Sequence, residues 1–183
     1  TASPVRVAAS VIMVRDLPVG LHVYLQRRVR TMAFAAGMHV FPGGAVEPGD
    51  VDRASMLVTA DSELASLPFA VRPADSPGED TLASRIAAVR ETLEETSHDL
   101  GNPVQLGYVG HWVTPAVEDR RFDTRFYASV VSEGHHVREN SGESDADRWL
   151  RPADALAESA AGNMLMLPPT VATLADFAAL AGV

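Results

Sequence analysis

The sequence predicts a single domain that combines β-strands with α-helices, and three observations support this fold class. Its 183 residues suffice for one sizeable core, and 46% hydrophobic with 21% charged residues is typical of globular proteins. The segments 5–14 and 22–29 are rich in β-forming residues and flank a turn with Pro and Gly, as in a hairpin. A long amphipathic helix is predicted later, with Asp80 or Thr81 as its N-cap and Gly101 as its stop.

The remaining elements follow in chain order. Residues 37–50 are so dense in Gly and Pro that we expect a loop, apart from a short strand at 38–41. Residues 51–80 interrupt the pattern, with one or two short helices followed by a Pro-rich linker. The segments 104–114 and 120–131 are β-like, and a last helix closes the chain. No internal repeat is present, and no boundary splits the chain into two domains.

Composition excludes several classes of function. The formal charge of −9, without any basic run, disfavours nucleic acid as a partner. The absence of cysteine and lysine excludes disulfides, thiol nucleophiles, cysteine-bound zinc, Schiff bases and a Walker-type phosphate loop. No apolar run approaches the roughly 20 residues of a membrane span, and no signal sequence opens the chain. We therefore expect a cytoplasmic protein that does not act at a membrane.

The predicted long helix gathers three glutamates on one side. At 100° per residue, Glu91, Glu94 and Glu95 share an arc of about 100°. The opposite side carries Leu82, Ile86, Val89 and Leu93, which predicts a core-facing stripe. A solvated face is the simplest interpretation, but Glu91 and Glu95 stand at i,i+4, where like charges cost roughly 0.2–0.5 kcal/mol. Oxygen ligands of this kind suit Mg²⁺, which commonly binds carboxylates together with substrate phosphate oxygens.

A glycine pair in the earlier loop, Gly43 and Gly44 within "FPGGAVEPGD", would let the backbone approach a ligand closely. Together with "RETLEE" on the helix, this segment resembles the Nudix hydrolase signature G-x5-E-x7-R-E-U-x-E-E-x-G-U, in which U is apolar. Gly44 matches the first Gly of the signature and Asp50 stands at its first Glu. The R-E-U-x-E-E core falls on residues 90–95, with its Arg and all three Glu in place. The resemblance extends from about Val5 to the final helix.

The chain also departs from this signature. Between Asp50 and Arg90 lie 39 residues instead of seven, so the segment at about 51–80 is an insertion inside the Nudix box. Thr92 replaces an apolar position, Ser97 the second Gly and His98 the last apolar position. These changes, and an Asp50 too short to keep the supporting role of Glu, leave open a binding module that has lost catalysis. A dimerisation domain with an acidic helix face is a third hypothesis.

The resemblance implies one Nudix domain over residues 1–183, an α/β/α sandwich with a mixed sheet and a loop-helix-loop that binds Mg²⁺ or Mn²⁺. The implied activity is hydrolysis of the diphosphate in a nucleoside diphosphate linked to another group X. Glu94 and Glu95 are expected to ligate metal, with Glu91 as a further ligand or as the base. The Gly43 carbonyl is a further expected ligand, and Arg90 would hold the glutamates through charge-assisted hydrogen bonds.

Further resemblance points to the branch with an interrupted box, which includes coenzyme A diphosphatases. Its features here are Trp112–Thr114 and "RFDT" at 121–124. Glu143 resembles a late acidic residue that serves relatives as ligand or base; a solvated loop residue is the alternative. Arg28 and Arg30 would meet a substrate phosphate, beside the close approach allowed at Gly44. Coenzyme A or an acyl derivative is the first expected substrate, followed by an ADP-sugar or a dinucleotide, and a homodimer stays open.

Overall fold

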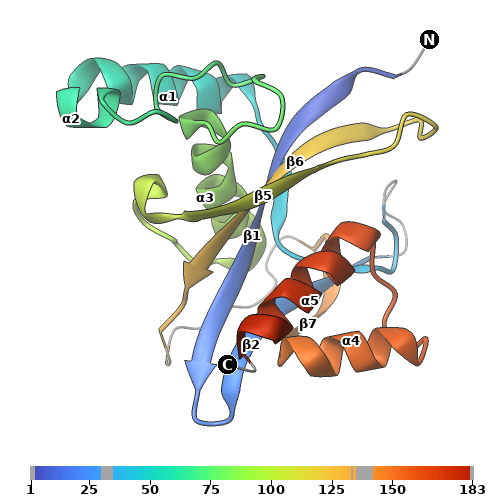
Figure 1. The fold of residues 1–183 in the computed structure, drawn as a ribbon. Coiled ribbons are helices and arrows are strands. Elements are labelled where there is room, and N and C mark those ends of the chain that lie inside the picture. The colour runs from blue at the N-terminus through green and yellow to red at the C-terminus, as the bar shows by residue number, and fades with distance from the viewer. Residues whose placement is uncertain (1–2, 30–34, 133, 135–141, 182–183) are drawn as a thin grey trace. The chain divides into compact units, whose positions relative to one another are not determined.

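The structure is a computed structural model that describes residues 3–29, 35–132, 134 and 142–181 (Figure 1). Its helices are α1 Pro48–Ala60, α2 Ser62–Ala65, α3 Leu82–Thr96, α4 Pro152–Ala160 and α5 Pro168–Ala181. Its strands are β1 Val5–Leu17, β2 Gly20–Arg28, β3 His39–Val40, β4 Gly43–Ala45, β5 Gly107–Val113, β6 Arg121–Val130 and β7 Ser144–Leu150. Within the described part of the chain, no helix is long and apolar enough to cross a membrane.

The chain divides into two compact units. The first consists of Thr1–Val11, Gly43–Leu93 and Asp99–Ser129, and the second of Ile12–Pro42, Glu94–His98 and Val130–Val183. Strand β1 and helix α3 therefore each contribute to both units. The single domain expected over residues 1–183 stays a prediction.

In the first unit, the beginning of β1 pairs antiparallel with β4, so that Ala9 lies opposite Gly44 and Ser10 opposite Gly43. Strands β5 and β6 form an antiparallel pair, and β6 neighbours β1 in the strand order. This arrangement places the glycine pair in a strand beside β1. The sequence predicted a loop there. In the structure, pairing with β1 makes both glycines part of strand β4.

The expected insertion is folded rather than extended. Helices α1 and α2 occupy its first part, which confirms the prediction of one or two short helices. Ala54 and Leu64 of these helices share a buried cluster with Leu82 and Ile86 of α3, and Phe69 packs against it. The cluster gives the insertion a core of its own within the first unit.

Charged residues of β6 hold the end of this insertion. The Asp123 carboxylate accepts a hydrogen bond from the backbone N–H of Gly78 at 2.8 Å, and Arg125 Nε donates to the Glu79 carbonyl at 3.0 Å. Arg125 is fully buried. Two charged residues of the "RFDTR" segment thus fix the loop that leads into α3.

In the second unit, β2 lies between β1 and β7 and also pairs with β3, and each of these pairings is antiparallel. The β1–β2 hairpin that the sequence predicts is confirmed, with Leu17 opposite Gly20 across a two-residue turn. Helix α4 contacts β2 and α5 (Figure 1). Strand β7 and helix α4 were not predicted, since the one element expected after residue 131 was the last helix.

Helix α3 begins where the sequence places it but ends earlier. Thr81 Oγ1 accepts a hydrogen bond from the Ser84 backbone N–H at 3.2 Å, as an N-cap does. The helix ends at Thr96 instead of continuing to Gly101, because Ser97 takes a left-handed conformation with φ +55°. His98 therefore lies beyond the end of the helix that carries the three glutamates.

The expected division of α3 into one core face and one carboxylate face holds only for part of the helix. Leu82 and Ile86 are buried as predicted, but Leu93 is 45% exposed and Glu95 only 4% exposed. The last turn contributes to the second unit, where the Glu95 carboxylate accepts a hydrogen bond from a buried polar side chain. The periodic pattern predicts the first turns correctly and is wrong for Leu93 and Glu95.

Candidate active site

Arg90 joins the two segments that resemble the signature, and it lies with Asp50 in the first unit. Its Nε donates to Asp50 Oδ1 at 3.1 Å and its Nη2 to Asp50 Oδ2 at 3.0 Å, a two-point contact across the insertion. Nη2 also donates to the Ala45 carbonyl at 3.0 Å, and Asp50 Oδ2 accepts the Glu47 backbone N–H at 2.9 Å. Asp50 is 3% exposed, so these donors surround a buried carboxylate. The shorter Asp50 therefore keeps its contact with the helix.

The same arginine also holds the first glutamate of the cluster. Arg90 Nη1 donates to Glu91 Oε1 at 2.9 Å. The hydrogen bond with Asp50, followed by the charges of Glu91 and Asp50, outweighs desolvation and raises the pKa of Arg90 above its usual value. Arg90 is accordingly a permanent cation that fixes both carboxylates.

Gly43 and Gly44 each lie close to a neighbouring group that a larger residue would displace. A side chain at Gly44 would meet the Glu91 carboxylate, with the added Cβ 2.7 Å from Oε2 and closer still to Oε1. A side chain at Gly43, whose φ is +155°, would instead collide with the backbone of Ala9 and Ser10. Gly44 thus leaves room for the glutamate, while Gly43 leaves room for the neighbouring strand.

The other two glutamates of the cluster belong to the second unit. Glu94 is exposed. Glu95 is 4% exposed, and its Oε2 accepts a hydrogen bond from Gln26 Nε2 at 2.7 Å. Sequence analysis missed Gln26, although a polar residue in a strand otherwise buried around it signals a buried polar partner.

Arg28, which is expected to bind substrate, and Glu143, which is expected to bind metal, lie beside each other in the second unit. Arg28 Nη2 lies 3.7 Å from Glu143 Oε2, and the Val29 backbone N–H donates to the Glu143 carbonyl at 2.8 Å. The Arg28 side chain is 18% exposed and that of Glu143 49% exposed. Arg30 falls outside the described residues.

The donor chemistry of α3 suits a hard divalent cation. Among residues 3–29, 35–132, 134 and 142–181, no three His, Asp or Glu side chains converge as a metal site. Glu91 and Glu95 are each held by a hydrogen-bond donor, from Arg90 and Gln26 respectively. Carboxylate oxygens are suitable ligands for Mg²⁺ and Mn²⁺, and a side chain held in one rotamer presents them in a fixed position.

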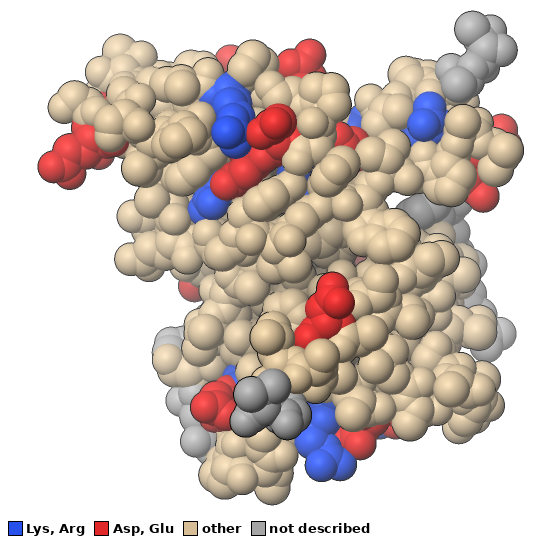
Figure 2. Space-filling model, viewed as in Figure 1, with Lys and Arg blue, Asp and Glu red and all other residues tan. Residues whose placement is uncertain are grey.

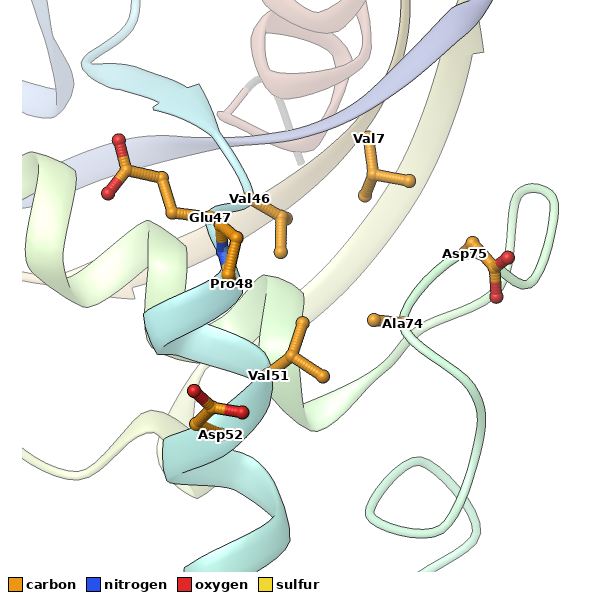
Figure 3. A pocket seen from close by; sticks show the side chains of 8 residues that line it. All are labelled: Val7, Val46, Glu47, Pro48, Val51, Asp52, Ala74 and Asp75. Carbon is orange, nitrogen blue, oxygen red and sulfur yellow. The ribbon is translucent and has the colours of Figure 1, made fainter.

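A pocket of about 440 Å³ opens in the first unit beside the start of α1 (Figure 3). Its apolar lining is Val7, Val46, Pro48, Val51 and Ala74. Its polar lining consists of three carboxylates, from Glu47, Asp52 and Asp75, without a basic residue. Like charges would repel a diphosphate from this pocket, so it does not suit that part of a substrate.

Charged side chains of both signs lie on the surface. On the face shown in Figure 2, the described basic and acidic residues are scattered among uncharged ones and form no continuous basic patch. The formal net charge of the chain is −9.

No protein-family model and no curated protein sequence matches the chain. Solved structures do match. A Nudix hydrolase from Alicyclobacillus acidocaldarius is 26% identical with a TM-score of 0.78, covering 98% of this chain and 93% of that one. A complex of the Caenorhabditis elegans Ap4A hydrolase is 19% identical with a TM-score of 0.60, covering 98% and 100%.

A third similar structure is the Nudix domain of Shewanella oneidensis NrtR complexed with ADP-ribose. It is 13% identical with a TM-score of 0.61, and the match covers 94% of this chain and 86% of that one. These likenesses confirm the predicted fold class, a Nudix-like α/β fold with a mixed, open sheet. The match to the Alicyclobacillus acidocaldarius Nudix hydrolase over nearly the whole chain supports a hydrolase.

Proposed function

We propose that the protein is a metal-dependent pyrophosphohydrolase that cleaves the diphosphate of a nucleoside diphosphate linked to a further group. One observation carries the proposal: Arg90 binds Asp50 at two points and Glu91 at a third, while Gly44 leaves the space that the Glu91 carboxylate fills. The insertion has separated these residues by 39 positions, yet they keep their contacts. Such contacts are expected if the carboxylates bind metal or accept a proton in the reaction.

Glu91, Glu94 and Glu95 are the proposed ligands of Mg²⁺ or Mn²⁺, with Glu91 as ligand or base. The Gly43 carbonyl and Glu143 are proposed as further ligands. When bound, the cation would neutralise phosphate oxygens and make a water more acidic. Arg90 would hold Glu91 in one orientation, because a charge-assisted bidentate contact with Asp50 fixes the guanidinium itself.

The reaction is attack of water on one phosphorus of the diphosphate. A bond forms between the water oxygen and that phosphorus, the bridging P–O bond breaks, and the second phosphate leaves with the bridging oxygen. One proton from the water must be accepted, and Glu91 is the candidate base. The products are two phosphate monoesters when the substrate has the form of a nucleoside diphosphate linked to a sugar or alcohol.

Local structure favours the enzyme over a binding module that has lost catalysis. Asp50, although shorter than Glu, retains its contact with Arg90. Thr92 is fully buried and its hydroxyl donates to the Ala88 carbonyl, so it fills an apolar position without an unpaired donor. Ser97 adopts the positive φ that the signature glycine would adopt freely. These three departures from the signature are therefore compatible with a working site.

The substrate proposal rests on fewer observations. Coenzyme A or an acyl derivative is supported by the partial match of residues 112–114 and 121–124 and by Arg28, which would meet a phosphate. The solved structures that resemble the chain instead include an Ap4A hydrolase and a complex with ADP-ribose. A dinucleotide and an ADP-sugar are therefore equal members of the test panel.

The test is product identification by mass spectrometry after incubation with Mg²⁺ or Mn²⁺ and a panel of candidate substrates. The panel contains coenzyme A, an acyl-coenzyme A, ADP-ribose, NADH, a diadenosine polyphosphate and nucleoside triphosphates. We expect one of the diphosphate-linked compounds to be cleaved, with loss of activity in Glu94→Gln and Glu95→Gln. Glu63→Gln, which alters an exposed glutamate of α2, is the matched control and should retain activity.

Absence of cleavage with either metal would refute the enzymatic proposal. Thermal unfolding separates the two remaining hypotheses, because a ligand that binds only the folded state raises the midpoint. A binding module with a metal site would be stabilised by Mg²⁺, by about 2.7 kcal/mol at one hundred times the dissociation constant. A dimerisation domain with a solvated acidic face would show no such shift.

A further inference from the structure

Gln26 is a buried amide whose two polar ends have different surroundings. Its side chain is 1% exposed, and Nε2 donates to Glu95 Oε2 at 2.7 Å. Its Oε1 is buried and finds no hydrogen-bond partner among the residues that the structure describes. An unpaired buried amide oxygen costs about 1–3 kcal/mol, so its retention calls for a partner such as a water or an ion.

The backbone around Gln26 is fixed on both sides. Within β2, Gln26 lies opposite Val40 of β3 and Asp147 of β7, so hydrogen-bonded strands flank it in both directions. Glu95 is 4% exposed at the end of α3. Because the donor stands on a strand held from both edges, it can hold the carboxylate in one rotamer at little further entropic cost.

We propose that Gln26 is a positioning residue for Glu95, and that its Oε1 accepts a hydrogen bond from a water bound to the divalent cation. This inference rests on the proposed function, in which Glu95 is a metal ligand. Mg²⁺ keeps several water ligands in proteins, and such waters donate hydrogen bonds. One amide would then orient a ligand through Nε2 and receive a metal-bound water through Oε1, which explains the otherwise unpaired oxygen.

The test is calorimetric titration of the metal-free protein with Mn²⁺, without any substrate. Gln26→Met keeps the length and apolar volume of the side chain but removes both polar ends. Loss of a partner that orients a metal ligand typically weakens metal affinity by about 10–100-fold, and we expect a loss in this range. Thr173→Val is the matched control, since it removes a buried polar group of α5 that is 5% exposed and should leave the affinity unchanged.

Activity provides a second measurement that a purely structural role would not alter in the same way. Gln26→Met should require a higher Mn²⁺ concentration for half-maximal activity, with the KM for the nucleotide at saturating Mn²⁺ little changed. Glu95→Gln should weaken Mn²⁺ binding whether or not Gln26 positions Glu95, because the proposed function makes Glu95 itself a metal ligand. Because Gln26→Met leaves Glu95 buried beside an apolar group, Gln26→Asn serves as a second variant if the first does not fold. Its amide is one methylene too short to reach Glu95, so the same loss of affinity is expected.

The outcomes separate this inference from the function on which it rests. If Glu95→Gln weakens Mn²⁺ binding while Gln26→Met or the folded Gln26→Asn binds as tightly as wild type, the positioning role is refuted and the hydrolase proposal stands. If wild type neither binds Mn²⁺ nor cleaves any panel compound, the proposed function fails and the inference fails with it. Parallel loss in both Gln26 variants, with Thr173→Val unchanged, supports the role.

Discussion

Gly44→Ala tests whether the glycine is present for the sake of the Glu91 carboxylate. The added Cβ would lie 2.7 Å from Glu91 Oε2 and closer still to Oε1, whereas ordinary contacts begin at 3.4 Å. The carboxylate would therefore have to retreat by about 1 Å, and a displacement of that size at a catalytic group can cost about 10²-fold in rate. Gly44 has no left-handed φ, so alanine fits its backbone conformation.

The expected result is a loss of activity without a comparable loss of stability. The atoms that must move are the far end of a flexible side chain, so the free energy of unfolding should change by only about 1 kcal/mol or less. Steady-state kinetics with the substrate that wild type cleaves give the activity. Titration with Mn²⁺ gives the metal affinity, and urea unfolding gives the free energy of unfolding. Gly49→Ala is the matched control, because its Cβ would meet nothing within 4 Å and it lies in the first turn of α1.

Two results would contradict this argument. Wild-type activity and Mn²⁺ affinity in Gly44→Ala would show that the position of the Glu91 carboxylate is unimportant. Equal losses in Gly44→Ala and Gly49→Ala would show that the region is sensitive to any added methyl group. In either case the close fit between glycine and glutamate would have no functional meaning.

Three further predictions concern stability. Gly43→Ala should destabilise by about 1–3 kcal/mol in urea unfolding, because its Cβ would lie 2.7 Å from Ser10 Cα and overpack the strand pair; an unchanged midpoint would contradict this. Asp50→Ala should lower the free energy of unfolding by about 3 kcal/mol, because Arg90 is then left partly buried without its main partner. A smaller loss of unfolding free energy than in Gly49→Ala would refute the importance of the pair. Burial, and then the charge of Arg27, lowers the pKa of His39 below 6.5, so the unfolded chain binds the proton first on acidification. Unfolding free energies should therefore fall as pH decreases below 6.5, and less steeply in His39→Leu.

The sequence predicts the parts of the site that depend on local spacing. The signature places Arg90 beside Glu91 and leaves five residues between Gly44 and Asp50, and the structure brings these residues into one group. The start of α3 at Thr81 was predictable for the same reason, since an N-cap is defined by its immediate neighbours.

Other features depend on contacts between distant segments and were not predictable. Gln26 and Glu95 are 69 residues apart, and no periodicity in either segment reveals their hydrogen bond. The early end of α3 follows from the backbone conformation of Ser97, a residue type that helix-stop rules do not single out. The pairing of Arg28 with Glu143 likewise joins two residues that sequence analysis had assigned to separate tasks.

The 39 residues between Asp50 and Arg90 raise the question of how the two sides of this contact remain together. Lengthening a flexible connection from seven to 39 residues costs about 1.5 kcal/mol of closure entropy. A single hydrogen bond to a charged group contributes about 1.5–3 kcal/mol, and Arg90 makes two to Asp50. The insertion also folds α1 and α2 onto α3 through a buried cluster, so the effective flexible connection is shorter than 39 residues. The Arg90–Asp50 contact is thus sufficient to offset the closure entropy of the longer connection, and it keeps Gly44 close to Glu91.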